Sequence, residues 1–220
     1  MKEFSIPGYK ELLKTTITGR SIIYLKETDS TNNYALGLIK DSGKMKKGLN
    51  GTVILAEIQN RGRGRRERMW ISPPGGLWFT IIIETKLEEK KLPEITLIAA
   101  YSVASILNRK YSVGVNIKWP NDIYCCKSKL GGILTEVEKI KGKVFLIIGI
   151  GINVNNDIKS ISLKDTDATS TMIILGKEIE RENLLSEILL EFENNYHYYS
   201  DTEDFDTIFK KIKNILDYNL

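Results

Sequence analysis

Two strongly apolar runs rich in β-branched residues constrain the fold more than any other feature of the sequence. Residues 77–84 read LWFTIIIE, and residues 144–154 read VFLIIGIGINV. β-branched and aromatic residues favour strands. Between the two runs, residues 92–109 place apolar side chains at helical spacing, which predicts a helix that faces a core. Strands at the centre with helices around them predict an α+β fold, a mixed β-sheet flanked by helices.

The rest of the chain extends this pattern. Further strands are predicted at residues 21–25, 52–58, 115–119, 123–126, 132–137 and 144–150. Helices are predicted at residues 9–18, ending at Gly19, and between an N-cap at Ser30 and a stop at Gly43. Residues 181 to about 218 predict two more helices. No internal repeat or low-complexity linker is visible, so residues 1–220 are expected to form one domain.

Composition and charge exclude several classes of protein. The apolar and charged fractions, 42% and 27%, are those of an ordinary globular chain and exclude collagen, coiled-coil and disordered proteins. The net charge of +4 is lower than is usual for a protein that binds nucleic acid through a strongly basic surface. His197 is the only histidine, and Cys125 and Cys126 are the only cysteines. This set argues against a zinc site and against histidine-based catalysis.

The chain is expected to be cytoplasmic. Its two adjacent cysteines provide no disulfide framework, which fits a reducing compartment. The N-terminal residues contain no apolar segment of signal-peptide length. The longest apolar run, residues 144–154, is too short to cross a bilayer, so no membrane association is expected.

The most informative segment for function is residues 59–74, QNRGRGRRERMWISPP. Glycines let a backbone approach an anion closely, and arginine side chains pair bidentately with carboxylate or phosphate. Trp70 adds a face for stacking. Because the segment joins two buried strands and ends in Ser-Pro-Pro, it predicts an ordered loop over an anionic, partly aromatic ligand. A solvated basic loop or an RGG-like RNA-binding patch is the alternative interpretation.

Three other segments place polar residues where a ligand could bind. Residues 29–33, DSTNN, begin a helix, which suits polar ligand atoms, although plain N-capping explains the same residues. Residues 118–122, KWPND, form a turn, and the later Lys129 precedes two glycines that leave room for a ligand. The alternative interpretation is that the side chain of Lys129 is exposed to solvent and binds no ligand. The alternating glycines of residues 149–155, GIGINVN, indicate a bulge or a close approach by another backbone or a ligand. Neither a dinucleotide fingerprint nor a GxxxxGK[ST] phosphate loop is present.

In this order, the four segments resemble the catalytic domain of biotin protein ligases. The family pattern is S-T-N, Q-x-x-G-R-G-R-R-x-R-x-W-x-S-P, K-W-P-N-D, K-L-x-G-I-L-x-E and G-I-G-I-N-V-N, and the match extends from about residue 24 to about residue 171. The resemblance implies the α+β fold shared with lipoate ligases and class II synthetases. It implies a ligase that uses ATP, with Mg²⁺ on the phosphates, to convert biotin to biotinyl-5′-AMP. The acceptor would be one lysine of a biotin carboxyl carrier protein domain, and the enzyme a homodimer.

The resemblance also assigns roles to individual residues. Lys129 and Arg65 are the expected catalytic residues, because their charges would stabilise the negative charge on the α-phosphate. Residues 62–65 would close over biotin and its carboxylate. The residues expected to bind biotin are Ser30, Thr31, Asn32, Gln59, Gly62, Arg63, Gly64, Arg65, Lys129 and Gly132. Those expected to bind ATP are Arg65, Arg68, Trp70, Asn121, Lys129 and Asn153, with the adenine near Trp70, Asn121 and Asn153.

The chain departs from the family pattern in two places. Glu67 stands where the family's loop commonly has glycine, and two effects of this exchange are open: a stiffer loop, or an offset of one arginine charge. The β-barrel cap that usually follows the catalytic domain is expected to be absent or truncated. Only 29 residues precede Ser30, so no N-terminal helix-turn-helix and no DNA-binding role are expected. Two alternatives remain, a lipoate ligase of the same fold and an RNA-binding protein that uses its Arg/Gly segment; the arginine-dense loop and Gln59 favour biotin.

Overall fold

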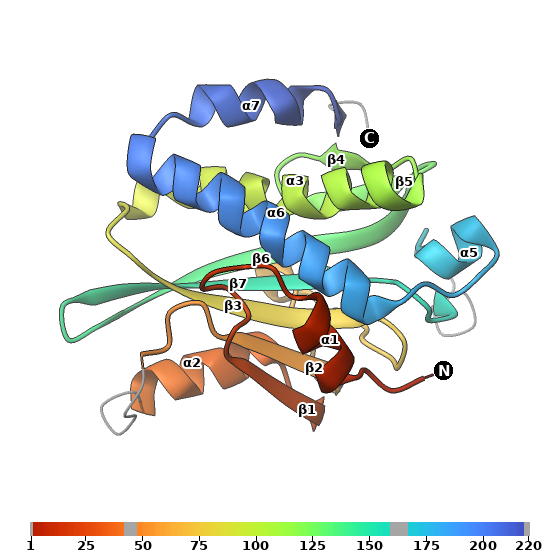
Figure 1. Cartoon of the computed structure of the whole chain (residues 1–220), viewed down its shortest axis with the longest axis horizontal. Helices are drawn as coiled ribbons and strands as arrows, with labels where there is room; N and C mark the ends of the chain where they lie inside the picture. The colour runs from red at the N-terminus through yellow and green to blue at the C-terminus, as the bar shows by residue number, and fades with distance from the viewer. Residues whose placement is uncertain (1, 42–47, 159–166, 218–220) are drawn as a thin grey trace.

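A computed structural model describes residues 2–41, 48–158 and 167–217, and in it eight strands form one mixed sheet (Figure 1). The sheet order is β1-β2-β3-β7-β6-β5-β4-β8. The strands are β1 (Ile22–Thr28), β2 (Val53–Gln59), β3 (Leu77–Thr85), β4 (Asn116–Lys118), β5 (Asp122–Cys125), β6 (Ser128–Ile140), β7 (Lys143–Ile152) and β8 (Leu216–Asp217). The pairs β1–β2 and β4–β8 are parallel and the other pairs antiparallel. The predicted α+β class is confirmed.

Helices cover both faces of the sheet. Helices α3 and α6 lie on one side, with α7 beyond them, and α2 lies on the other side (Figure 1). The helices are α1 (Ile6–Leu12), α2 (Thr31–Asp41), α3 (Leu92–Tyr111), α5 (Thr171–Leu175), α6 (Arg181–Thr202) and α7 (Phe205–Lys213). Within the described ranges, no helix combines the length and apolar character needed to cross a membrane.

The alternation of side chains along the strands divides the apolar residues between two cores. On β3, Phe79 and Ile81 belong to the larger core, together with residues of α3 and α6. Ile82 belongs to the smaller core under α2, together with Ile147 of β7. Thr80 shares the parity of Ile82 and therefore lies on the face that α2 covers, here called the α2 face. The polar residues discussed below gather on this face.

Most predicted elements are present, with shifted ends. The helix predicted at residues 9–18 is wrong over most of its length, because α1 spans Ile6–Leu12. The following segment is a loop whose N–H groups, from Thr16 to Thr18, donate to the Glu193 carboxylate of α6 at 2.6 to 3.0 Å. The stop predicted at Gly43 lies outside the described residues. The sequence predicts neither α5 nor β8, and β6 is longer than expected.

Candidate functional site

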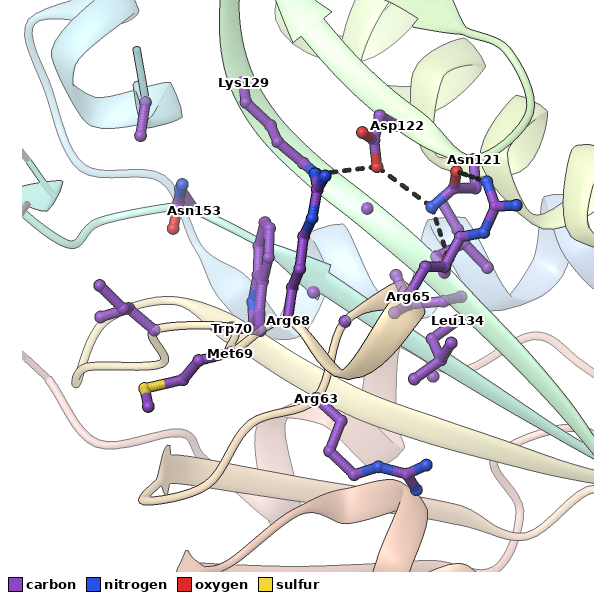
Figure 2. Close-up of a pocket in the computed structure, with 18 of the residues that line it drawn as sticks. Arg63, Arg65, Arg68, Met69, Trp70, Asn121, Asp122, Lys129, Leu134 and Asn153 are labelled. Atoms are coloured by element: carbon purple, nitrogen blue, oxygen red, sulfur yellow. Dashed lines mark hydrogen bonds and ion pairs between the residues drawn. The ribbon is translucent and has the colours of Figure 1, made fainter. Parts of the chain in front are cut away.

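A cavity of about 840 Å³ opens on the α2 face and is lined by almost all of the expected site residues. It lies beside β6 and β7, beneath the segment that joins β2 to β3 (Figure 2). Of the expected residues, those that line it are Ser30, Thr31, Asn32, Gln59, Arg63, Gly64, Arg65, Arg68, Trp70, Asn121, Lys129, Gly132 and Asn153. Gly62 does not line the cavity and is buried within the segment that joins β2 to β3. Segments that lie far apart in the sequence thus meet at one cavity, as the motif pattern predicts.

Two glycines of β7 let other side chains lie flat on this part of the sheet. A Cβ atom on Gly149 would lie 2.2 Å from Asn32 Oδ1, and one on Gly151 would lie 2.6 Å from Trp70 Nε1. Any larger residue would displace these side chains. The alternating glycines predict a bulge or an approach by another backbone or a ligand; the atoms that approach Gly149 and Gly151 are instead side-chain atoms of Asn32 and Trp70.

Lys129 and Arg65, the expected catalytic pair, are connected through two intervening side chains (Figure 2). Lys129 Nζ lies 2.8 Å from Asp122 Oδ1 and 5.2 Å from the centre of the Trp70 ring. Asn121 Nδ2 donates to Asp122 Oδ1 at 3.1 Å, and Arg65 Nη1 donates to Asn121 Oδ1 at 2.8 Å. The sequence indicates Asp122 only as a turn residue, yet its carboxylate holds the ammonium group of Lys129.

The backbone around Lys129 explains its position. A tight turn joins β5 to β6, and its two central residues, Cys126 and Lys127, have φ of 48° and 68°. The N–H of Lys129 donates to the carbonyl of Asp167 at 2.6 Å, and its carbonyl accepts from Thr169 at 3.0 Å. The strand therefore aims this side chain at the cavity, as the sequence predicts.

The Gly/Arg segment folds into its own narrow hairpin. The N–H of Trp70 donates to the carbonyl of Gly62 at 2.8 Å, and the N–H of Gly64 donates to the carbonyl of Arg68 at 2.7 Å. A Cβ atom on Gly62 would lie 2.3 Å from the Trp70 carbonyl oxygen. Gly62, expected in the biotin site, does not line the cavity: it is buried within the hairpin, where the absence of a side chain lets the two arms approach closely.

The loop arginines point in different directions (Figure 2). Arg63 turns away from Lys129 and binds the Glu136 carboxylate through both terminal nitrogens, at 2.7 and 3.2 Å. The side chain of Arg68 extends toward Lys129, and within the described part of the chain this side chain makes no hydrogen bond or ion pair. The structure therefore does not bring Arg63 and Lys129 together. Glu136 is not among the residues predicted for the site, although it ends the K-L-x-G-I-L-x-E pattern and, on β6, points to the same face of the sheet as Gly132.

The end of the cavity near α2 is polar. The N–H of Thr31 donates to Gln59 Oε1 at 2.9 Å, and Gln59 Nε2 donates to Ser72 Oγ at 2.8 Å. Asn32 Nδ2 donates to Glu136 at 2.8 Å and to the carbonyl of Leu134 at 3.3 Å. The cavity thus combines a cationic end, around Lys129, with an end rich in amide and hydroxyl groups.

Two titrating groups report on the local environment. Burial and the negative charges of Asp122 and Asp167 raise the pKa of Tyr124, which lines the cavity. Burial opposes ionisation of Asp29 at the start of α2, but hydrogen bonds from Asn33 and from the N–H of Ser30 outweigh it and lower the pKa of Asp29. Trp70 Nε1 is a buried donor for which the described part of the chain supplies no acceptor.

Comparison with known proteins decides the family. Residues 24–153 match the model of the Biotin/lipoate A/B protein ligase family. The chain belongs to this family. It is 38% identical over 192 residues to the bifunctional ligase/repressor BirA of Bacillus subtilis, which covers 85% of this chain and 57% of the relative. The chain therefore spans little more than half the length of that relative.

Solved structures agree with this family. The biotin protein ligase of Aquifex aeolicus in complex with biotin and ATP superposes with a TM-score of 0.73 at 31% identity, over 90% of this chain and 78% of that protein. The Leishmania major enzyme in complex with biotinyl-5-AMP has a TM-score of 0.73 at 24% identity, over 91% of this chain and 83% of that protein, and supports the fold.

Proposed function

We propose that this chain is an ATP-dependent biotin–protein ligase whose reactions take place in the cavity described above. One observation carries the proposal: a single cavity has a polar end, rich in amide groups, near α2 and a positively charged end at Lys129. Relatives at 31–38% identity are named as ligases, and one of them is solved with biotin and ATP bound. The ureido ring of biotin suits the amide end, and its carboxylate and the ATP phosphates suit the cationic end.

In the first reaction, a carboxylate oxygen of biotin attacks the α-phosphorus of ATP, and the bond to pyrophosphate breaks. Two anions must approach each other, which costs several kcal/mol in a poorly solvated cavity unless cations lie between them. Lys129 and Arg65 supply these charges and stabilise the negative charge that grows on the α-phosphate oxygens. Mg²⁺ would arrive on the ATP phosphates, as it commonly does without an all-protein cage. Among the described residues, no group of three or more His, Cys, Asp and Glu side chains is arranged to hold a metal.

In the second reaction, the amine of an acceptor lysine attacks the carbonyl carbon of biotinyl-5′-AMP. The C–N bond of the amide forms as the bond between the carbonyl carbon and the phosphate oxygen breaks, the nitrogen gives up one proton to solvent and keeps one, and AMP leaves. The acceptor would be a biotin carboxyl carrier protein domain. Residues 62–65 and Arg68, which form the loop over the cavity, would shield the mixed anhydride from water until the acceptor arrives. We further infer a homodimer that works in the cytoplasm.

Biotin-dependent exchange of labelled pyrophosphate into ATP tests the proposal. A biotin ligase exchanges the label only when biotin is present, whereas a lipoate ligase does so only with lipoate. Absence of exchange with either acid, together with RNA binding that weakens steeply with salt, would favour the RNA-binding alternative. Transfer is then measured by mass spectrometry of a carrier-protein domain, which gains one biotinyl group at one lysine.

A further inference from the structure

The only two cysteines of the chain are neighbours, and they lie where strand β5 turns into β6. Cys125 is the last residue of β5 and is buried in the larger core, whereas Cys126 begins the turn and is exposed. Neither residue takes part in the proposed reactions, and neither lines the cavity. Cys125 Sγ lies 3.8 Å from Cys126 Sγ. The chain therefore holds a pair of free thiols close together, next to the site and outside it.

The backbone of the turn brings the two sulfurs together. Successive side chains of a strand point to opposite faces, which would hold adjacent thiols apart. Here Cys126 has a φ of 48°, in the left-handed region, so the alternation stops between the two cysteines. Lys127 follows with a φ of 68°, and because such turns normally use Asn-Gly, this one forms at a cost in backbone energy. A bond between the sulfurs can therefore shift the turn to another conformation.

The same turn sets the position of Lys129. Cys125 pairs with Ser128, the residue directly before Lys129. The Cys125 sulfur is confined, since it lies in the packed core and 3.3 Å from the carbonyl oxygen of Val113. To form a bond of about 2.05 Å, the turn must therefore carry Cys126 toward the buried sulfur. Lys129 would move with the turn, and a displacement of about 1 Å at a reacting site can cost about 10²-fold in rate.

We propose that Cys125 and Cys126 form a reversible disulfide, and that this modification slows the first reaction by displacing Lys129. The bond does not depend on the proposed function, whereas its effect on the rate rests on that function. Adjacent Cα atoms lie about 3.8 Å apart, closer than the roughly 4.4–6.8 Å of ordinary disulfides. A disulfide between neighbours is therefore strained and easily reduced, which suits the transient disulfides of a reducing compartment.

The oxidant is a low-molecular-weight disulfide. The thiolate of the exposed Cys126 attacks one sulfur of the oxidant, the S–S bond of the oxidant breaks, and its other half leaves and takes up a proton. Burial, together with the hydrogen bond and the charge of Cys126, raises the pKa of the Cys125 thiol to about 11, so Cys125 reacts second. Its sulfur attacks the Cys126 sulfur, and a second thiol leaves with the Cys125 proton. The protein loses two hydrogen atoms, and the oxidant becomes two thiols.

Glutathione disulfide is the probe, and because the chain has no other cysteine, its effect reports on this pair alone. We expect the unchanged chain to lose the mass of two hydrogen atoms and to exchange pyrophosphate at least about tenfold more slowly, with dithiothreitol restoring both. Cys126→Ser keeps the size of the exposed side chain and cannot form the bond, so it should stay within about twofold of its untreated rate. A chain that only gains one glutathione, or that joins a second chain, overturns the bond. An internal bond with undiminished exchange overturns its effect on Lys129.

Phenylarsine oxide tests the closeness of the two thiols without oxidising them. Its arsenic bonds to both sulfurs, and its oxygen leaves as water with the two thiol protons. One equivalent should remain on the unchanged chain in excess monothiol and none on Cys126→Ser; loss of the arsenical from the unchanged chain overturns the pair. The outcomes separate the two proposals. A reduced chain without biotin-dependent exchange refutes the ligase and the inhibition together, while the mass of the oxidised chain still decides the bond. Normal exchange in the reduced chain, with no internal bond after oxidation, refutes only the disulfide.

Discussion

Replacement of Lys129 with methionine tests the charge at the centre of the proposed first reaction. Methionine keeps much of the side-chain length and removes the ammonium group, whose Nζ lies 2.8 Å from Asp122 Oδ1. A phosphate oxygen about 4 Å from that ammonium would interact with it by about 4 kcal/mol at an effective dielectric constant of about 20. The carboxylate of Asp122 already offsets part of this attraction. We therefore expect a loss of about 3–4 kcal/mol in the transition state, which slows the reaction by about 10²–10³-fold.

The same substitution should leave the fold intact. The side chains of Lys129 and Asp122 are 31% and 24% exposed, and ion pairs this accessible contribute about 0–1 kcal/mol. Asp122 keeps its hydrogen bond from Asn121. The expected fall in Tm is therefore no more than about 4 °C for a chain of this size.

The assay is the initial rate of biotin-dependent pyrophosphate exchange at saturating biotin and ATP, with Tm measured on the same preparations. Lys139→Met is a matched control, because Lys139 lies on the same strand and also pairs with an acid, Glu89 at 2.7 Å. Lys139 does not line the cavity, so this variant should exchange pyrophosphate normally. A folded Lys129→Met protein that keeps more than about a tenth of the exchange rate would refute the reasoning.

Three other substitutions probe the cationic end of the site and the loop before β1. Trp70→Ala should weaken ATP about 10–100-fold and biotin less, because the indole is expected to stack on the adenine; isothermal titration measures both affinities. Arg65→Gly removes the hydrogen bond to Asn121 and should let biotinyl-5′-AMP escape, which a biotin blot of a bystander such as serum albumin detects. Glu193→Gln should lower the stability at pH 7 by about 3 kcal/mol, measured by urea unfolding, because the carboxylate accepts several backbone N–H groups.

Each of these expectations has an outcome that contradicts it. A Trp70→Ala protein that keeps its ATP affinity and loses biotin would reverse the orientation of the two ligands. A bystander that stays unlabelled, while Arg65→Gly still forms adenylate, would show that this arginine does not retain the intermediate. For Glu193, burial raises the pKa, but the backbone hydrogen bonds outweigh it and hold the pKa at about 2, below the ordinary value of a glutamate. The stability that the ionised Glu193 carboxylate gives to the folded chain is therefore present above about pH 5 and lost as the pH falls toward 2. A stability difference between Glu193→Gln and the unchanged chain that persists at pH 2 would be inconsistent with this cause.

The sequence predicts those features that depend on local pattern. The apolar runs locate β3 and β7, and the motifs bring Lys129, Trp70 and Gln59 to one cavity. The helix predicted at residues 9–18 fails because a partner far along the chain, Glu193, binds the backbone N–H groups of its second half. Tertiary contacts of this kind override local helix preference.

The site residues that the sequence misses also depend on distant partners. Glu136 binds Arg63 across 73 positions, and Asp122 meets Lys129 only because a tight turn folds β5 back onto β6. No spacing in the sequence specifies these pairs.

The contacts of the Gly/Arg hairpin have a consequence for how this chain tolerates sequence change. Arg63, near the start of the hairpin, binds Glu136, which also binds Asn32. Ser72, just after it, binds Gln59. The two arms of the hairpin therefore bind opposite ends of one polar network on the sheet, which runs from Glu136 through Asn32, Thr80 and Thr31 to Gln59. Substitutions in the hairpin and in the network should show epistasis, with combined effects that differ from the sum of the single ones. Directed evolution of a new substrate range would then succeed more often with libraries that vary both regions together than with libraries confined to the hairpin.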